Sequence, residues 1–300
     1  MASFSNQAKT EIVASMTSKS RRFAFLYGAL LSARQLHAES IVVQTECEAF
    51  AQFFAEEIQK ICPAVELDTQ YRSRKGKMPV WNFECNDKDA ISQILQKFQI
   101  DPHAREVSFS LLQNETDYPA LAAGMFVMSG SVSDPNKDYH LEIPVPNESL
   151  SSMLCLLIGG INIAAKTVRR KGEFVVYLKQ NEQISDLLTY FGAQNAVMEL
   201  VYAQAYKNMV SQTNRRMNCD LANIEKSVAA CEQQIADIEL IRDRIGFDEL
   251  PETLRAVAQA RLDAPEATLR DLGALLDPPI SRSGVHHRLQ KLADIAKTLR

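Results

Sequence analysis

The apolar positions of the first two-thirds of the chain follow one order of spacings, and that order occurs twice. In the first copy, helical spacing predicts helices over 22–35, over 48–61 and from Asp87 through Phe98. Alternating or β-branched stretches predict strands at 41–43, 67–72 and 78–83, and the second copy, 119–192, has strands at 140–143 and 174–177. Each copy should run helix, hairpin, helix, hairpin, helix: an α+β unit with antiparallel strands covered by helices on one face.

Matching residues set the length of the repeat. Gly28 and Gly124 stand 96 residues apart, and so do the turn glycines Gly76 and Gly172. A repeat of this length doubles a whole domain, because solenoid units are only about 20 to 50 residues long.

The last third of the chain loses the strand pattern and is expected to be helical. An amphipathic helix is predicted over 223–244 and another over 250–262. The first has an apolar stripe formed by Ile224, Val228, Cys231, Ile235, Ile238 and Ile241. The polar stretch before it is interpreted as a linker. The predicted parts are 1–109 (N-terminal segment and first repeat), 110–208 (second repeat), 209–222 (linker) and 223–300 (helical domain).

Two helices joined by a short turn are predicted near the end of the chain. Thr268 and Asp271 form a capping-box pattern ahead of the first helix, and Asp277-Pro278-Pro279 ends it. Gly273 lies inside that helix, where only close packing explains a glycine. Ser281 is a natural N-cap for the second helix. Its buried stripe is Val285, Leu289, Leu292, Ile295 and Leu299. This is the helix-turn-helix pattern, whose second helix enters the major groove of double-stranded DNA.

The exposed face of the second helix is polar and basic. From 280 to 300, five Lys and Arg residues stand against one acid, Asp294. The predicted DNA-contacting residues are Thr268, Arg270, Ser281, Arg282, Ser283, His286, His287, Arg288, Gln290 and Lys291. The pair His286 and His287 is interpreted as a donor surface, because adjacent helical residues point about 100° apart and no third metal ligand is evident. The alternative is an amphipathic helix pair whose charged face is only solvated.

Composition and charge narrow the classes of protein to which the chain can belong. The net charge of −4 gives no basic signature for the whole chain, so a nucleic-acid surface must be a local patch. The six cysteines show no zinc spacing, which favours reduced thiols in the cytosol. No signal peptide or membrane span is recognisable. We therefore expect a cytoplasmic protein with no cofactor, no metal and no membrane partner.

The first helix of each copy resembles the LAGLIDADG helix of homing endonucleases. Residues 122–130 keep both motif glycines, and the first copy keeps Leu26 and Gly28. Glycine at the third motif position, Gly28 and Gly124, predicts that the two helices pack backbone to backbone. In those nucleases the eighth motif position is an acid that holds divalent metal, but here these positions are Ala33 and Ser129. The nearest acid, Asp134, is expected to open a turn. The resemblance therefore implies a doubled domain that has lost its nuclease chemistry, and we expect no enzyme.

Basic residues cluster at the tips of the equivalent hairpins and in the linker. In the nuclease family such residues contact DNA phosphates, whereas an ordinary hairpin tip also carries solvated Lys and Arg. The possible phosphate contacts are Arg72, Arg74, Lys75 and Lys77 in the first copy, Lys166, Arg169, Arg170 and Lys171 in the second, and Arg215 and Arg216 in the linker. The alternative is that this surface is a platform for proteins, such as transcription or cell-division proteins, or for a small ligand.

Two long strings, at 130–142 and 276–289, closely resemble the WhiA family, and the resemblance covers essentially the whole chain. That family couples a degenerate LAGLIDADG double domain to a helix-turn-helix similar to sigma-factor region 4. The resemblance implies a nucleoid-associated, sequence-specific DNA-binding regulator of transcription. It also implies roles in cell division, chromosome segregation and, in sporulating lineages, sporulation. The alternatives are a chromosome- or division-associated adaptor and, disfavoured by Ala33 and Ser129, a metal-dependent endonuclease. The oligomeric state and the target motif are left open.

Overall fold

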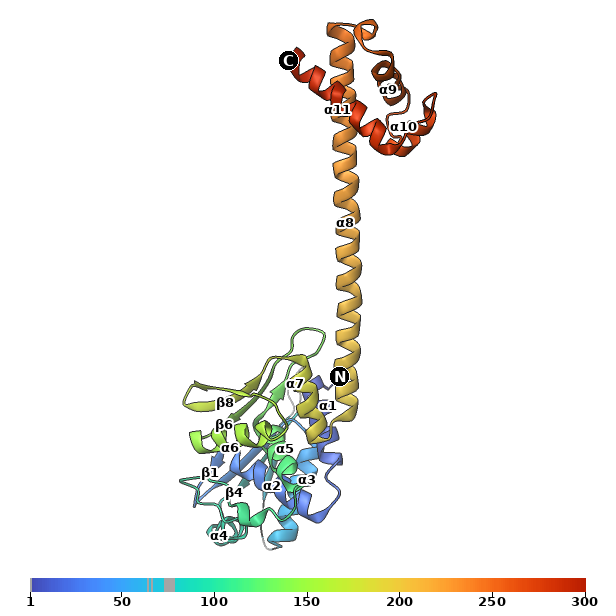
Figure 1. Ribbon diagram of the computed structural model, residues 1–300. Coiled ribbons are helices and arrows are strands. Elements are labelled where there is room, and N and C mark those ends of the chain that lie inside the picture. Colours follow the sequence, from blue (N-terminus) through green and yellow to red (C-terminus); the bar gives the residue numbers. More distant parts are fainter. Residues whose placement is uncertain (1, 64, 66, 73–78) are drawn as a thin grey trace. The chain divides into compact units, whose positions relative to one another are not determined.

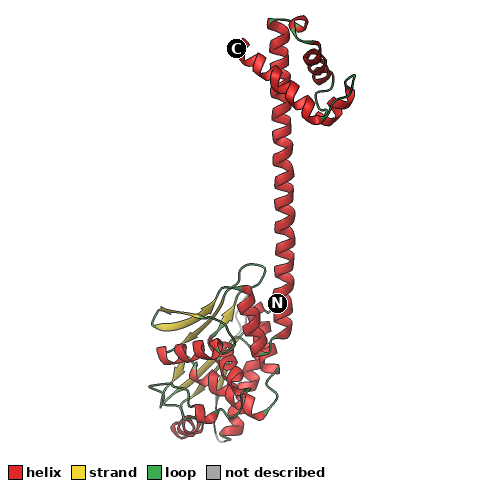
Figure 2. Ribbon diagram, in the orientation of Figure 1, coloured by secondary structure: helices red, strands yellow, loops and turns green. Residues whose placement is uncertain are grey.

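The computed structural model describes residues 2–300 except 64, 66 and 73–78, and it divides into two compact units (Figure 1). We call Met1–Lys207 the doubled unit and Asn208–Arg300 the helical unit. The doubled unit combines helices with antiparallel strands, whereas the described elements of the helical unit are all helices (Figure 2). Each unit has its own buried core. None of the described helices is long and apolar enough to cross a lipid bilayer.

The doubled unit contains both copies of the predicted order of elements. The first copy consists of α2 (Lys19–Leu31), β1 (Gln35–Leu36), β2 (Ile41–Thr45), α3 (Glu48–Ile61), β3 (Asp68–Arg72), β4 (Val80–Cys85) and α4 (Lys88–Lys97). A short 3₁₀ helix, η1 (Phe109–Leu111), separates it from the second copy. The second copy consists of α5 (Asp117–Ser129), β5 (Ser131–Val132), β6 (Leu141–Val145), α6 (Glu148–Gly159), β7 (Lys166–Arg170), β8 (Glu173–Leu178) and α7 (Asn181–Phe191). The predicted α+β order is confirmed in both copies.

Each copy builds its own four-stranded antiparallel sheet. The strand orders are β1-β2-β4-β3 and β5-β6-β8-β7. In the central pair of the first sheet Val43 lies opposite Phe83, and in the second sheet Ile143 lies opposite Val176. All four of these side chains are buried, so the register is repeated together with the side chains that it turns toward the core.

The helices α2 and α5 meet backbone to backbone at the two motif glycines. A Cβ on Gly28 would overlap the carbonyl oxygen of Leu121, and a Cβ on Gly124 would overlap that of Phe25. Only glycine permits this approach, so the close packing predicted from the repeated motif is confirmed.

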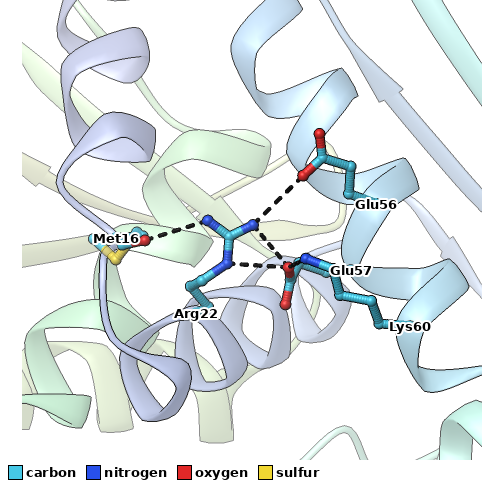
Figure 3. A network of polar contacts seen from close by, with 5 residues as sticks. All are labelled: Met16, Arg22, Glu56, Glu57 and Lys60. Carbon is cyan, nitrogen blue, oxygen red and sulfur yellow. Dashed lines mark hydrogen bonds and ion pairs between the residues drawn. The ribbon is translucent and has the colours of Figure 1, made fainter.

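An ion pair connects the start of α2 with α3 (Figure 3). Arg22 donates from Nε and Nη2 to Glu57 Oε1, at 3.0 and 2.7 Å, and Lys60 donates to the same oxygen at 2.7 Å. Burial alone would raise the pKa of the Glu57 carboxyl, but the hydrogen bonds from Arg22 and Lys60 outweigh burial and hold the pKa below its usual value.

Two helix boundaries in the doubled unit differ from the sequence prediction. The structure starts α2 at Lys19 rather than 22, because the Ser18 hydroxyl accepts a hydrogen bond from Arg21 N and caps the helix there. The helix ends at Leu31 rather than 35, because Gln35 pairs with Val42 as the first strand residue.

A further helix, α1 (Phe4–Ala14), lies in a stretch where the sequence pattern predicted no element. It buries Phe4, Ala8 and Ile12 in the core of the doubled unit. Its Glu11 carboxylate accepts hydrogen bonds from the backbone N–H groups of Asn195 (2.9 Å) and Ala196 (3.4 Å). A carboxylate at this place satisfies otherwise unpaired N–H groups, and its negative charge interacts favourably with the positive N-terminal end of the following helix.

That following helix, α8 (Gln194–Arg244), is 51 residues long. The predicted start of a helix at 223 is therefore wrong, and the stretch 209–222 is helical throughout. The physical reason is that this stretch is polar but contains neither proline nor glycine, so nothing in it interrupts helical hydrogen bonding. The helix ends just before Gly246, which has a φ of 76°.

The helical unit continues with η2 (Phe247–Glu249), α9 (Glu252–Asp263), α10 (Leu269–Leu275) and α11 (Arg282–Leu299). Its core is formed by Ile238, Ile241, Leu250, Leu254, Val257, Ala258, Leu272, Leu276, Val285, Leu289, Leu292 and Ala296. The predicted stripe of α8 is thus buried only in its last part, at Ile238 and Ile241. The earlier members Ile224 and Val228 are 59% and 51% exposed.

Candidate nucleic-acid interface

The helix α10 begins at a cap formed by Thr268 and Asp271. The Thr268 hydroxyl accepts a hydrogen bond from Asp271 N at 3.3 Å and donates to Asp271 Oδ2 at 2.7 Å. The predicted N-cap is confirmed, with one difference from a full capping box: the acidic side chain bonds the threonine hydroxyl. Thr268 and Arg270 are both exposed beside this cap.

A close backbone contact sets how α10 meets the turn before α11. Ile280 N donates to the carbonyl oxygen of Gly273 at 3.0 Å, and a Cβ on Gly273 would overlap the carbonyl oxygen of Ile280. The close packing predicted for this glycine is confirmed. Leu272 and Leu276 are buried beneath the contact, whereas Leu275 is 64% exposed.

The helix α11 starts at the predicted cap. Ser281 Oγ accepts from Gly284 N at 3.2 Å and lies 2.9 Å from Ser283 Oγ. Val285, Leu289 and Leu292 of the predicted stripe are buried, while Ile295 and Leu299 are half-buried at the edge of the same core. The buried side of α11 therefore fixes which side faces solvent.

The solvent side carries the predicted polar residues. Arg282, Ser283, His286, His287, Gln290 and Lys291 are all exposed. Arg288 differs: it is half-buried, and its Nη1 donates to the Thr253 carbonyl of α9 at 3.4 Å. Its guanidinium is therefore partly engaged within the fold.

Of the five Lys and Arg residues between 280 and 300, two have an acidic partner in the structure. Arg300 forms an ion pair with the buried Asp237, and Lys297 lies 3.4 Å from Asp294. Arg282 and Lys291 have no hydrogen-bond or ion-pair partner among the described residues. The unpaired positive charge therefore lies at the start and the middle of α11, where the polar side chains are exposed.

The hairpin β7–β8 presents the second predicted basic cluster. Its tip turns at Lys171 (φ 50°) and Gly172 (φ 91°), and Lys166, Arg169, Arg170 and Lys171 are exposed. Two of these cations have local partners: Arg170 lies 3.7 Å from Glu142, and the Arg169 guanidinium lies over the Phe174 ring at 5.6 Å.

The equivalent cluster of the first copy is only partly described. Arg72 is exposed at the end of β3 and donates to Gln70 at 2.9 Å. Arg74, Lys75 and Lys77 lie outside the described residues. In the helical unit, Arg215 and Arg216 are exposed on α8.

The two motif positions that carry acids in homing endonucleases are occupied by internally bonded residues. Ala33 is 1% exposed, and its carbonyl accepts from Arg105 Nη1 at 2.8 Å. Ser129 Oγ lies 3.0 Å from the Met125 carbonyl and 2.6 Å from the Pro144 carbonyl, so its single proton is used within the fold. Asp134 accepts from Asn136 N at 2.9 Å and opens a turn, as predicted. No group of three or more His, Cys, Asp or Glu residues suited to a metal occurs among the described residues.

Arg105 is the residue at this place that the sequence analysis missed. It is 7% exposed, and its second nitrogen, Nη2, donates to the Leu36 carbonyl at 3.1 Å. Burial lowers the pKa of its guanidinium. No local pattern signals this role, because Arg105 and Ala33 are 72 residues apart in the chain.

Comparison with known proteins matches both units to domain models of one family. The family model described as the WhiA LAGLIDADG-like domain matches residues 22–107 and 119–210, and the model described as the WhiA C-terminal HTH domain matches residues 213–296. Together they match most of the chain.

Individual relatives agree with these models. A protein of Lachnoclostridium phytofermentans named "Probable cell division protein WhiA" is 37% identical over 99% of both chains. One of the same name from Ruminiclostridium cellulolyticum is 37% identical over 92% of this chain and 89% of its own. The crystal structure of full-length DUF199/WhiA from Thermatoga maritima is similar with a TM-score of 0.58, at 22% identity and 99% coverage of both chains, which supports the fold.

Proposed function

The chain belongs to the WhiA family, and on that premise we propose that it is a sequence-specific DNA-binding regulator of transcription that reads DNA through α11. The observation that carries the proposal is the exposed first half of α11. Its polar side chains have few partners, while the capped helix start and the Gly273 contact hold the scaffold in place. A recognition helix needs this combination of a fixed backbone and available side chains.

The proposal gives the exposed residues different roles. His286, His287 and Gln290 read base edges, because they lie on the solvent face of the first turns of α11. Arg282 and Lys291 bind phosphates, and Arg288 adds a phosphate contact if it releases Thr253. Thr268, Arg270, Ser281 and Ser283, which are exposed at the starts of α10 and α11, contact the DNA backbone.

The doubled unit contributes binding without cleavage in this proposal. Ala33 and Ser129 supply no carboxylate for a divalent metal. We expect no cut in any DNA with Mg²⁺ or Mn²⁺ at protein excess. Metal-dependent cleavage by pure protein that is reproduced in an independent preparation would contradict this. The phosphate contacts proposed for this unit come from Arg72, Arg74, Lys75, Lys77, Lys166, Arg169, Arg170 and Lys171, with Arg215 and Arg216 from α8.

The cellular role in this proposal is transcription control linked to cell division, exerted at the nucleoid in the cytoplasm. Chromosome segregation and, in sporulating lineages, sporulation are the processes that such control would serve. A genome-wide DNA footprint of the tagged full chain tests this: discrete promoter sites support the regulator. Diffuse occupancy supports instead an adaptor that binds transcription or cell-division proteins through the doubled unit.

Base reading is tested on the full chain with a site selected from random DNA. Gln290→Ala and His287→Ala should each weaken binding to that site by about 1 to 3 kcal/mol and weaken binding to random DNA less. Lys297→Ala is the matched control, because Lys297 is also exposed on α11 but lies in the last turn of the helix, away from its capped start. If both variants bind the selected site as tightly as the control, α11 does not read DNA.

A further inference from the structure

The part of α8 within the helical unit exposes a stripe of large apolar side chains. Residues 208–230 are all exposed. The large apolar residues among them are Met209, Val210, Met217, Leu221, Ile224 and Val228, with exposed fractions from 38% to 60%. Helices in proteins gain most of their stability by packing an apolar face. Among the described residues nothing covers this face.

The spacing of the stripe is that of a coiled coil. Steps of four, three and four residues connect Met217, Leu221, Ile224 and Val228. Val210 lies one heptad before Met217, and the polar Asn214 lies one heptad before Leu221. This repeat of 3.5 residues keeps one seam facing a second helix, with Leu221 and Val228 at a positions and Met217 and Ile224 at d positions. We define the α8 seam as Val210, Asn214, Met217, Leu221, Ile224 and Val228.

The charges beside the seam select the direction of that second helix. If two copies ran parallel, Asp220 (position g) of each would face Glu225 (position e) of the other, and two like-charge contacts would result. If they run antiparallel, Asp220 faces Ser227 and Glu225 faces Asn218, so both repulsions disappear.

The antiparallel arrangement also joins complementary halves. Leu221 then lies against Ile224 of the other copy, and Met217 against Val228. The half from 210 to 220 carries Arg215, Arg216 and Asp220, a net charge of +1. It lies beside the half from 222 to 232 of the other copy, which carries Glu225, Lys226 and Glu232, a net charge of −1. All six charged residues are exposed. A helix that packs on its own copy in this way needs no other partner to match its charges.

We propose that the α8 seam binds the same seam of a second copy of this chain as a two-stranded antiparallel coiled coil.

Sedimentation equilibrium of the full chain over a wide concentration range tests the association. The wild type should show a concentration-dependent dimer. Leu221→Glu should weaken dimerisation roughly a hundredfold or more, because both symmetry-related sites lose a buried apolar side chain. The control Asn223→Glu adds the same charge at an exposed position on the outer side of the helix and should leave the dimer unchanged. A wild type that is monomeric throughout, or a Leu221→Glu variant that dimerises as the wild type does, overturns the proposal.

Cysteine crosslinking tests the direction, in a Cys219→Ser background because native Cys219 is exposed. A mixture of Leu221→Cys and Ile224→Cys chains should form the mixed disulfide under mild oxidation, since these positions face each other only in the antiparallel dimer. Each variant alone should crosslink poorly. Efficient crosslinking of each variant alone, without the mixed product, would mean a parallel pair and overturn the proposal.

Discussion

The doubled unit and the helical unit both bring backbone into close contact at a glycine, but they differ at the helix ends near that contact. At the end of α2 Arg105 bonds the Ala33 carbonyl, and at the end of α5 the Ser129 hydroxyl bonds the Pro144 carbonyl. At the start of α11, Arg282 has no partner among the described residues. The contrast shows how one packing device serves two purposes. In the doubled unit the polar groups at these helix ends bond to each other, and in the helical unit they face solvent, where a ligand can reach them.

The largest expected effect tests the close backbone contacts at the glycines. Gly28→Ala or Gly124→Ala should destabilise the doubled unit by about 3 kcal/mol or more, because the added Cβ overlaps a backbone oxygen that no side-chain rotation can move away. Gly273→Ala should do the same to the helical unit. Denaturant unfolding of the full chain, with a probe in each unit, measures both.

Gly159→Ala is the control for these variants, because beyond its chain neighbours and the backbone of α6 itself no heavy atom lies within 4 Å of a Cβ at that position. It should be neutral or stabilising by up to about 1 kcal/mol. If Gly28→Ala is as stable as Gly159→Ala, the two motif helices do not meet through their backbones.

The next effect concerns the closed helix end. Arg105→Met removes the donors of two backbone carbonyls, those of Ala33 and Leu36, and should cost the doubled unit about 2 to 4 kcal/mol. Arg34→Met is the matched control, since Arg34 is exposed next to Ala33. Equal unfolding midpoints for the two variants would show that the Arg105 bonds contribute nothing to stability.

A smaller effect depends on pH. The pKa of Glu57 is lowered in the folded state, so its stabilising contribution is complete above the usual carboxyl pKa of 4.5 and is lost as the pH falls through the lower folded pKa. Glu57→Gln should therefore destabilise the doubled unit by about 1 to 3 kcal/mol at neutral pH, and the difference should vanish in acid.

Glu56→Gln serves as the comparison for the pH series. The Glu56 side chain is 64% exposed and lies 3.7 Å from Arg22, so its loss should change stability by less than about 0.5 kcal/mol at any pH. A difference between wild type and Glu57→Gln that stays constant from neutral to acid pH would contradict the ionic role of Glu57.

The smallest effect on the fold is expected at the open helix start. Arg282→Ala should leave stability within about 0.5 kcal/mol of the wild type, because the side chain is exposed and has no partner among the described residues. It should weaken specific and random DNA binding about equally and reduce the slope of log affinity against log salt by about 0.9. An unchanged salt slope would remove Arg282 from the phosphate contacts.

The amino-acid sequence by itself determined what depends on local pattern. The duplicated order of helices and hairpins, the caps at Thr268 and Ser281, the polar face of α11 and the close approach at Gly28, Gly124 and Gly273 follow from spacing and residue type. Periodic burial and capping are short-range effects, so a single sequence reveals them.

The tertiary structure decided what depends on contacts between distant residues. It showed that Arg105 bonds the backbone just after α2 and that Glu11 of the unpredicted α1 caps α8. It also showed that Asp237 and Asp294 form ion pairs with two of the five C-terminal Lys and Arg residues. It also showed one helix from Gln194 to Arg244 where polar composition indicated a linker. In each case the partner is chosen by packing across the fold, and the free energy of a polar residue depends on that partner more than on its neighbours in the chain.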